Sequence, residues 1–329
     1  MRPLRIGVLG AARIAPLALI SPAKATGVAQ VTAVAARDAA RAGAYAVEHA
    51  IPIALDSYEA LIAHPEVDAI YNALPPSRHA DLTIAALAAG KPVLCEKPFA
   101  MDAAEAKRMT AAAAASGLVL MEAFHYRYHP LFARVLEICA SGEIGEVRRM
   151  AAVFTASIPD TGAELRYDPA LGGGALMDLG TYCLHWARTV AGAEPFGVQA
   201  QSVFGASGID ISTHAILTFP RGVLAELTCD MAAPVRASLE ITGLEGVLKV
   251  INPLAPQMGH MLEVTREGAE SRRETVTRDP TYDFQLRAFV SAVRGGPPPL
   301  TGGADAVAQM AAIDAIKAAA ALGGRTTLN

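Results

Sequence analysis

The first 122 residues alternate short apolar runs with stretches of helical periodicity. The predicted strands are Leu4–Leu9, Val31–Ala36, Ala69–Ala73, Pro92–Cys95 and Leu118–Met121. The predicted helices between them are Asp38–His49, Tyr58–Ala63, Arg78–Ala89 and Asp102–Ser116. Continuous apolar strands that alternate with helices predict a parallel, doubly wound sheet.

From about residue 123 the apolar positions instead alternate with polar ones, and hairpin signals join the runs. The predicted strands are Gly145–Ser157, Ser212–Phe219, Val223–Met231, Ala237–Thr242 and Gly246–Ile251. The predicted helices are Pro130–Ser141, one from the triple glycine Gly172–Gly174 to about Gly192, Asp283–Val293 and Ala304–Leu322. We therefore expect an α/β protein whose first domain spans residues 1–122. The second domain, residues 123–329, should hold a large, mostly antiparallel open sheet, and its C-terminal helices could pack back on the first domain.

The composition suits two folded domains that bind a small molecule. The chain has 329 residues, of which 52% are hydrophobic and 18% charged. A net charge of -4 provides no basic surface for nucleic acid or anionic lipid. No apolar run reaches the ~18 residues of a membrane-spanning helix, and a signal-like start is interrupted by Arg13. We expect a cytoplasmic protein that binds neither nucleic acid nor membrane.

The cysteines do not suggest a metal site. Cys95, Cys139, Cys183 and Cys229 lie far apart, and neither a CxxC pair nor interleaved histidines accompany them. They are typical of buried thiols in a reducing compartment, and we expect no metal ion.

The first strand runs into a glycine turn and a helix. Gly10 occupies the first position of the dinucleotide motif G-x-G-x-x-G/A, Ala12 replaces the second glycine, and Ala15 fills the third position. The amides at such a helix start bind a pyrophosphate. The motif predicts a Rossmann domain, although a strand–glycine–helix turn also occurs in other α/β domains.

The end of the second strand bears on the choice between NAD and NADP. An acid there usually accepts from the ribose 2′-hydroxyl of NAD, whereas arginines accommodate the 2′-phosphate of NADP. Arg37 stands at the strand end, and Arg41 follows one helical turn later. Asp38 is well placed to cap the next helix, which favours NADP. The alternative is that Asp38 binds ribose and both arginines are solvated.

Two further motifs carry candidate catalytic groups. Glu96, Lys97 and Pro98 follow the strand Pro92–Cys95, at the carboxyl edge where doubly wound sheets bind ligands, and a cis Lys97–Pro98 bond would fix the direction of the lysine. The helix after the triple glycine carries Asp178 and Tyr182, which share a face because they are four residues apart. Oxidation of an alcohol needs a group that takes its proton, and lysine and tyrosine can both do so when their surroundings lower their pKa.

Together these motifs resemble the glucose–fructose oxidoreductase/inositol dehydrogenase (Gfo/Idh/MocA) family over essentially the whole chain. Within it, Ala35–Arg41 and the turn at Gly10 look most like dimeric dihydrodiol dehydrogenase and the NADP-dependent D-xylose 1-dehydrogenases. The inositol dehydrogenases carry a histidine where this chain has Tyr182, so inositol is a poorer substrate candidate.

The resemblance implies an NADP-dependent oxidoreductase that transfers a hydride between NADP and a CH–OH group of a sugar, polyol or dihydrodiol. It implies that Lys97, Asp178 and Tyr182 are catalytic. The expected cofactor-binding residues are Gly10, Ala12, Arg13, Ile14, Arg37, Arg41, Leu74, Pro75, His79, Glu96 and Lys97. Arg127 and Tyr167 are candidate substrate residues, although both could serve in packing.

The sequence leaves the direction of the reaction, the catalytic activity itself and the oligomeric state open. The reaction could run as reduction of a keto-sugar, because the residues do not fix its direction. A non-catalytic NADP-binding sensor on the same fold is a second alternative, although a sensor needs no proton-transfer group. The family also implies association through the open face of the second sheet, as a homodimer or homotetramer.

Overall fold

The structure is a computed structural model that describes residues 2–322 and 326–327. It divides into two compact units. The first unit comprises Met1–Tyr128 together with Pro280–Val307, and the second comprises His129–Asp279 with Ala308–Asn329. The chain therefore leaves the first unit after Tyr128 and returns to it at Pro280. Among the described residues, no helix combines the length and the apolar character needed to cross a membrane.

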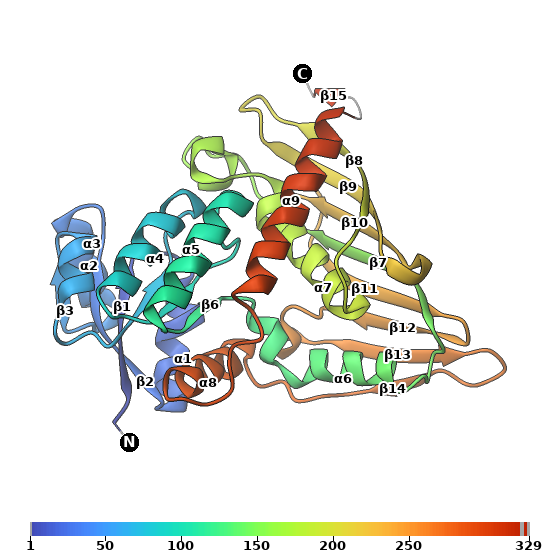
Figure 1. The fold of residues 1–329 in the computed structure, drawn as a ribbon, viewed down its shortest axis with the longest axis horizontal. Coiled ribbons are helices and arrows are strands. Elements are labelled where there is room, and N and C mark those ends of the chain that lie inside the picture. Colours follow the sequence, from blue (N-terminus) through green and yellow to red (C-terminus); the bar gives the residue numbers. More distant parts are fainter. Residues whose placement is uncertain (1, 323–325, 328–329) are drawn as a thin grey trace. The chain divides into compact units, whose positions relative to one another are not determined.

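The first unit contains the predicted parallel sheet, with strand order β3-β2-β1-β4-β5-β6 (Figure 1). Its strands are β1 Leu4–Leu9, β2 Ala29–Ala35, β3 Ile53–Leu55, β4 Ala69–Asn72, β5 Val93–Cys95 and β6 Leu120–Glu122, and every neighbouring pair is parallel. Its helices are α1 Ser21–Thr26, α2 Ala39–His49, α3 Tyr58–Ala63, α4 His79–Ala88, α5 Ala103–Ser116 and α8 Thr281–Val293, with a π-helical turn Pro16–Ile20 ahead of α1. The predicted Rossmann fold is confirmed, and β3 is an additional strand that the sequence pattern did not reveal.

Local signals explain where these helices begin. The Asp38 side chain accepts a hydrogen bond from the Arg41 amide, and the Asp102 side chain does the same for the Glu105 amide. Both are N-caps, which satisfy amides that have no partner within the helix. The capping role predicted for Asp38 is therefore confirmed.

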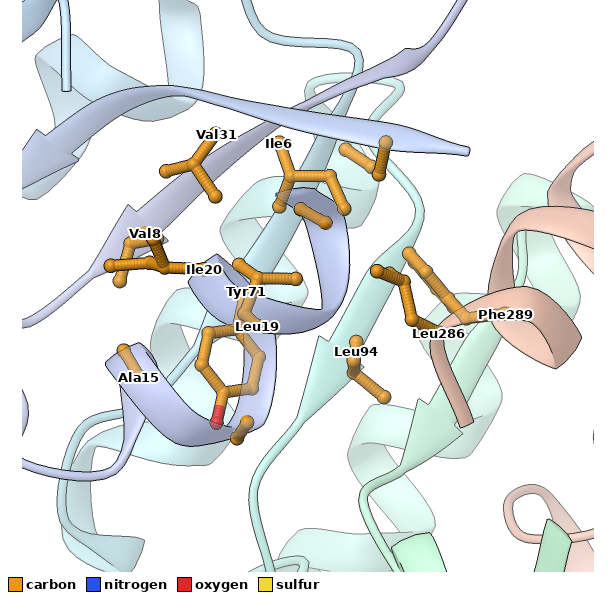
Figure 2. Close-up of a cluster of buried hydrophobic side chains, with 14 of the residues drawn as sticks. Ile6, Val8, Ala15, Leu19, Ile20, Val31, Tyr71, Leu94, Leu286 and Phe289 are labelled. Carbon is orange, nitrogen blue, oxygen red and sulfur yellow. The ribbon is translucent and has the colours of Figure 1, made fainter. Parts of the chain in front are cut away.

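The core on one face of this sheet includes residues from α8 (Figure 2). Leu286 and Phe289 are fully buried with Leu19, from the turn before α1, and with Ile6 and Leu94 from the sheet. Burial of an aliphatic or aromatic side chain contributes about 1.5–3 kcal/mol. A helix from near the C-terminus thus stabilises the N-terminal fold.

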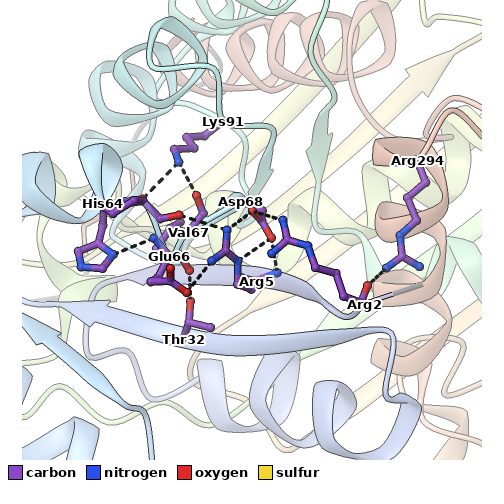
Figure 3. Close-up of polar contacts among 10 residues, drawn as sticks. Arg2, Arg5, Thr32, His64, Glu66, Val67, Asp68, Lys91 and Arg294 are labelled. Carbon is purple, nitrogen blue, oxygen red and sulfur yellow. Dashed lines mark hydrogen bonds and ion pairs between the residues drawn. The ribbon is translucent and has the colours of Figure 1, made fainter.

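Charged side chains join β1 to the chain segment before β4 (Figure 3). The Arg5 guanidinium donates to both carboxylate oxygens of Asp68, at 3.0 and 2.7 Å, and to Glu66 at 2.5 Å. These bonds from Arg5 are the main reason that the pKa of Asp68 falls from 3.8 to about 2.

We expect the Asp68→Asn variant to be less stable than the wild type at neutral pH. A carboxylate whose pKa is lowered by folding stabilises the native state above its unfolded pKa and loses that contribution as it is protonated. The stability difference should therefore shrink as the pH falls from about 4 to about 2. Urea unfolding at pH 7, 4 and 2.5 measures it, and a difference that is constant over this range would contradict the assignment.

The second unit is built on a sheet with strand order β14-β13-β12-β11-β7-β10-β9-β8-β15. The strands are β7 Val147–Thr155, β8 Gly197–Phe204, β9 Asp210–Thr218, β10 Leu224–Asp230, β11 Arg236–Gly243, β12 Gly246–Ile251, β13 Met261–Arg266, β14 Arg272–Glu274 and β15 Thr326–Thr327. Within the described residues, β7–β10 and β8–β15 pair in parallel and the other neighbours are antiparallel. The predicted mostly antiparallel sheet is confirmed.

The helices of the second unit are α6 Pro130–Ala140, α7 Thr181–Ala191 and most of α9 Ala304–Leu322. Helix α7 packs on β7 and β10 and continues a π-helical turn, Leu176–Gly180. The buried Arg188 of α7 binds Glu194 through two nitrogens and Gln309 of α9 through a third, which fixes α9 to α7.

Candidate active site

The glycine turn after β1 has the close packing that the dinucleotide motif requires. Gly10 has a φ of +99°, and a Cβ there would lie 3.0 Å from the Leu74 side chain. Ala15 is fully buried, so the third motif position also needs a small residue. Ala12 and Ile14 are half-buried and Arg13 is exposed beside the helix start. Small residues thus fill all three positions of the motif, as a turn that binds a pyrophosphate requires.

Side chains from α2 bind this turn. The Arg41 guanidinium donates to the Ala11 carbonyl at 3.0 Å, and the Tyr45 hydroxyl donates to the Ala12 carbonyl at 2.9 Å. The Asp38 carboxylate accepts from the Arg41 amide at 2.7 Å and lies 3.7 Å from Arg37 Nε. Asp38 is thus engaged as a helix cap, Arg41 contacts the turn, and the exposed Arg37 lies beside Asp38.

A third arginine, Arg78, lies near the start of α3 and was not identified from the sequence. Arg78 lies over the ring of Tyr58, 6.0 Å from its centroid. Burial raises the pKa of Tyr58, and the charges of Arg78, Arg41 and Arg37 oppose that rise. The charges of three arginines therefore reach Tyr58 at the start of α3, and arginines are the side chains that bind phosphate groups well. Arg78 is about 40 residues from Arg37 and Arg41, so no local pattern connects them.

His79, a predicted cofactor-binding residue, links two segments at the carboxyl edge of the sheet. It is fully buried, with Nε2 2.7 Å from the Leu74 carbonyl and Nδ1 3.0 Å from the Pro98 carbonyl. Burial lowers the pKa of His79, and the contacts with the Leu74 and Pro98 carbonyls oppose that change. His79 thereby joins the turn that contains Leu74 and Pro75 to the segment after β5.

The residues after β5 stand at the carboxyl edge of the first sheet. Glu96 Oε1 accepts from the fully buried Tyr71 hydroxyl at 2.5 Å, and Glu96 Oε2 accepts from the Lys97 amide at 3.3 Å. Lys97 is half-buried, and the Lys97–Pro98 bond is cis, as predicted. Tyr71 was not identified from the sequence. Tyr71 lies on β4 opposite Leu94 of β5. Its proximity to Glu96 could have been inferred only if the register of these two strands had been known.

Helix α8 also contributes groups near Glu96. Burial, followed by the charge of Glu96, raises the pKa of Tyr282. The Tyr282 ring lies 4.1 Å from the His125 ring, and His125 Nδ1 is 2.7 Å from the Thr281 hydroxyl. The candidate residue Arg127 is half-buried in the same turn, His125–Tyr128.

In the second unit an arginine holds the predicted catalytic carboxylate. Arg166 Nε donates to Asp178 Oδ2 at 2.6 Å, and its NH1 donates to Glu164 at 3.0 Å. Burial tends to lower the pKa of Arg166, but the Asp178 and Glu164 carboxylates together outweigh it and the pKa is raised. A carboxylate held in this way can accept a hydrogen bond from a substrate hydroxyl.

The tyrosines of the second unit differ in surroundings. Tyr182 is nearly buried, and its ring meets the Phe154 ring edge-on with centroids 5.7 Å apart. The Tyr167 hydroxyl donates to the Ile158 carbonyl at 2.7 Å, so Tyr167 shapes the loop that contains Arg166. Asp178 and Tyr182 thus belong to one helical segment of the second unit, whereas Glu96 and Lys97 belong to the first unit. Among the described residues, no group of His, Cys, Asp or Glu is arranged to hold a metal ion.

Two family models match the chain. Residues 4–124 match an oxidoreductase family with an NAD-binding Rossmann fold, and residues 132–249 match the GFO/IDH/MocA C-terminal domain.

Individual enzymes are similar over most or all of the chain. D-xylose 1-dehydrogenase (NADP(+)) 2 of Haloferax volcanii is 35% identical over 99% of this chain and 100% of that enzyme. Trans-1,2-dihydrobenzene-1,2-diol dehydrogenase of Bos taurus is 36% identical over 68% of this chain and 67% of its own length. Among solved structures, a 3-ketoreductase from Actinomadura kijaniata in complex with NADP and TDP-benzene is 31% identical, with a TM-score of 0.92 over 99% of this chain and 100% of that one.

Proposed function

The chain belongs to the Gfo/Idh/MocA family of NAD(P)-dependent oxidoreductases, and we propose that it transfers a hydride between NADP and a CH–OH group of a sugar, polyol or dihydrodiol. One observation carries the proposal. Gly10 follows β1 and Lys97 follows β5, and only β4 separates these strands, so the dinucleotide turn and the candidate proton carrier share the carboxyl edge of one sheet.

We assign the roles as follows. NADP, when bound, supplies or accepts the hydride. Lys97 takes the substrate hydroxyl proton during oxidation and returns it during reduction. Asp178, held by the hydrogen bond from Arg166, accepts a hydrogen bond from a substrate hydroxyl and so orients it. Tyr182 assists proton transfer through its hydroxyl, which both donates and accepts.

We expect NADP to bind at least about tenfold more tightly than NAD, because each hydrogen bond from an arginine to the 2′-phosphate contributes about 1.5–3 kcal/mol. Arg37→Ala and Arg78→Ala should weaken NADP binding and leave NAD binding nearly unchanged. Calorimetric titration of both cofactors into each variant measures the difference.

Arg108→Ala is the matched control for these arginine variants. Arg108 is an exposed arginine of α5 whose guanidinium lies beside Asp81 and Glu105. Its removal should change neither affinity. Equal affinities of the wild type for NADP and NAD would end the proposal of NADP preference.

The charge of the loop after β7 favours an uncharged substrate. Residues 156–172 carry Asp160, Glu164 and Asp168, and the cation within them, Arg166, is bound to two carboxylates. A diphosphate near Asp178 would have to displace these carboxylates. We therefore propose free aldoses, polyols or dihydrodiols ahead of nucleotide sugars.

The second candidate is reduction of a keto-sugar, favoured by the TM-score of 0.92 to the 3-ketoreductase. NADPH formation at 340 nm should be assayed over aldoses, polyols and dihydrodiols, and NADPH consumption over keto-sugars and nucleotide keto-sugars. Turnover of a nucleotide keto-sugar alone would reverse the proposed substrate class. A lack of turnover with every compound, together with tight NADP binding, would favour a non-catalytic sensor.

A further inference from the structure

The helical segment that carries Asp178 and Tyr182 begins against a carboxylate from a distant strand. The amide of Leu176, the first residue of the segment, donates to Asp210 Oδ2 at 2.7 Å. Asp210 is the first residue of β9. Ala175, the local residue at the N-cap position, makes no capping hydrogen bond through its side chain. Asp210 therefore does what an N-cap residue does for other helices, and its charge suits the positive end of the helix dipole.

The rest of the sheet fixes the Asp210 side chain. The same oxygen, Oδ2, accepts from the Thr213 hydroxyl at 2.8 Å, and that hydroxyl lies 2.7 Å from the Ser202 hydroxyl of β8. Thr213 and Ser202 are both buried. Partial burial raises the pKa of Asp210, and the bonds from Thr213 and Leu176 oppose that rise. Thr213 of β9 thus holds the Asp210 carboxylate, with Ser202 of β8 beside it, and the carboxylate accepts from the Leu176 amide.

The triple glycine provides the space for this contact. Gly174 has a φ of +119°, and a methyl group there would overlap Asp210 Oδ1. A methyl group on Gly173 would overlap the Arg166 carbonyl. The glycines therefore let Asp210 approach on one side and the loop of Arg166 on the other, immediately before the segment with Asp178.

We propose that Asp210 is a positioning residue for the reaction. Its bond to the Leu176 amide fixes the first turn of the helix, and that turn sets where the Asp178 carboxylate and the Tyr182 hydroxyl are presented. The kinetic part of this inference rests on the proposed function, whereas its structural part does not.

The kinetic test compares Asp210→Ala with Asp210→Asn. Displacement of a substrate-orienting group by about 1 Å can cost about 10²-fold in rate, so Asp210→Ala should lower kcat at least tenfold. Asp210→Asn should stay within about threefold of the wild type, because its amide oxygen can still accept from the Leu176 amide. The affinity for NADP should be unchanged in both variants, since the cofactor residues belong to the first unit.

Asn252→Ala is the matched control. The Asn252 side chain makes three hydrogen bonds to the backbone of its own turn in the second unit, to Ala255 twice and to Gly259. Its loss should lower the thermal stability but leave kcat unchanged. If Asp210→Ala and Asn252→Ala change the melting temperature and kcat alike, Asp210 acts only on stability and the inference is overturned.

Amide hydrogen exchange tests the structural part without a substrate. Residues 175–182 should exchange faster in Asp210→Ala than in the wild type, and at nearly the wild-type rate in Asp210→Asn. If no substrate is turned over, the proposed function fails, and this measurement still decides whether Asp210 holds the helix. Unchanged exchange in Asp210→Ala would overturn the inference. If Asp210→Ala does not fold, Asp210→Glu takes its place, because the longer side chain shifts the carboxylate by one methylene. Residues 175–182 should then exchange faster in Asp210→Glu than in the wild type. Exchange at the wild-type rate in Asp210→Glu would also overturn the inference.

Discussion

Replacement of Lys97 by alanine is expected to lower kcat by about 10²–10⁴, the usual cost of losing a positioned general acid or base. Lys97 is half-buried at the carboxyl end of β5, next to Glu96, which the buried Tyr71 holds through a hydrogen bond of 2.5 Å. The bond between Tyr71 and Glu96 does not involve the Lys97 ammonium group. The affinity for NADP should therefore stay within a few-fold of the wild type.

Lys91→Ala is the control for this variant. Lys91 lies just before the amino end of the same strand, and its ammonium group donates to the backbone carbonyls of His64 and Val67. Its loss should reduce stability without a specific effect on kcat. If Lys97→Ala keeps more than about a tenth of the wild-type kcat on the true substrate, Lys97 is not the proton carrier.

Helices and strands with a clear apolar period or a capping residue were predicted well from the sequence. The strand β1, the hairpin of β9 and β10 and the helices α2, α3 and α5 have clear apolar periodicity or capping residues, and their bounds agree with the prediction to within a few residues. The three-residue strand β3 is too short to show a period. Edge strands such as β14, with the sequence Arg-Arg-Glu, are mostly exposed and lack an apolar face.

We expected that the C-terminal helices could pack back on the first domain, but no local pattern indicated that α8 is the helix that does so. Its apolar face, which includes Leu286 and Phe289, indicates only that the helix is buried, not against which sheet. Long-range packing of this kind depends on the tertiary fold as a whole, and the sequence of one segment does not encode it.

The same distinction applies to the candidate site. Lys97, Asp178 and Tyr182 lie in compact motifs, so they were identifiable as candidates. Arg78 and Arg166 were not, because an arginine in a loop or at a helix start is most often a solvated residue. Only the tertiary structure places Arg78 over the ring of Tyr58. It also brings Arg166 into contact with Asp178.

The Tyr182→Phe variant is expected to lower kcat by about 10–10² with little change in KM, because it removes the hydroxyl that we propose assists proton transfer but keeps the ring. The ring packs edge-on against Phe154 and is nearly buried, so phenylalanine fits without a cavity. Asp178→Asn should instead raise KM as well as lower kcat, because it weakens both the bond from Arg166 and the proposed acceptor for a substrate hydroxyl.

The pH dependence separates a chemical role of Tyr182 from a packing role. If the Tyr182 hydroxyl takes part in proton transfer, the basic limb of the profile of kcat against pH should change in Tyr182→Phe. Phe154→Leu, which alters the packing around the Tyr182 ring and leaves its hydroxyl in place, should lower stability and keep the shape of the profile. A near-normal kcat and an unchanged profile in Tyr182→Phe would make Tyr182 a packing residue and leave proton transfer to Lys97 alone.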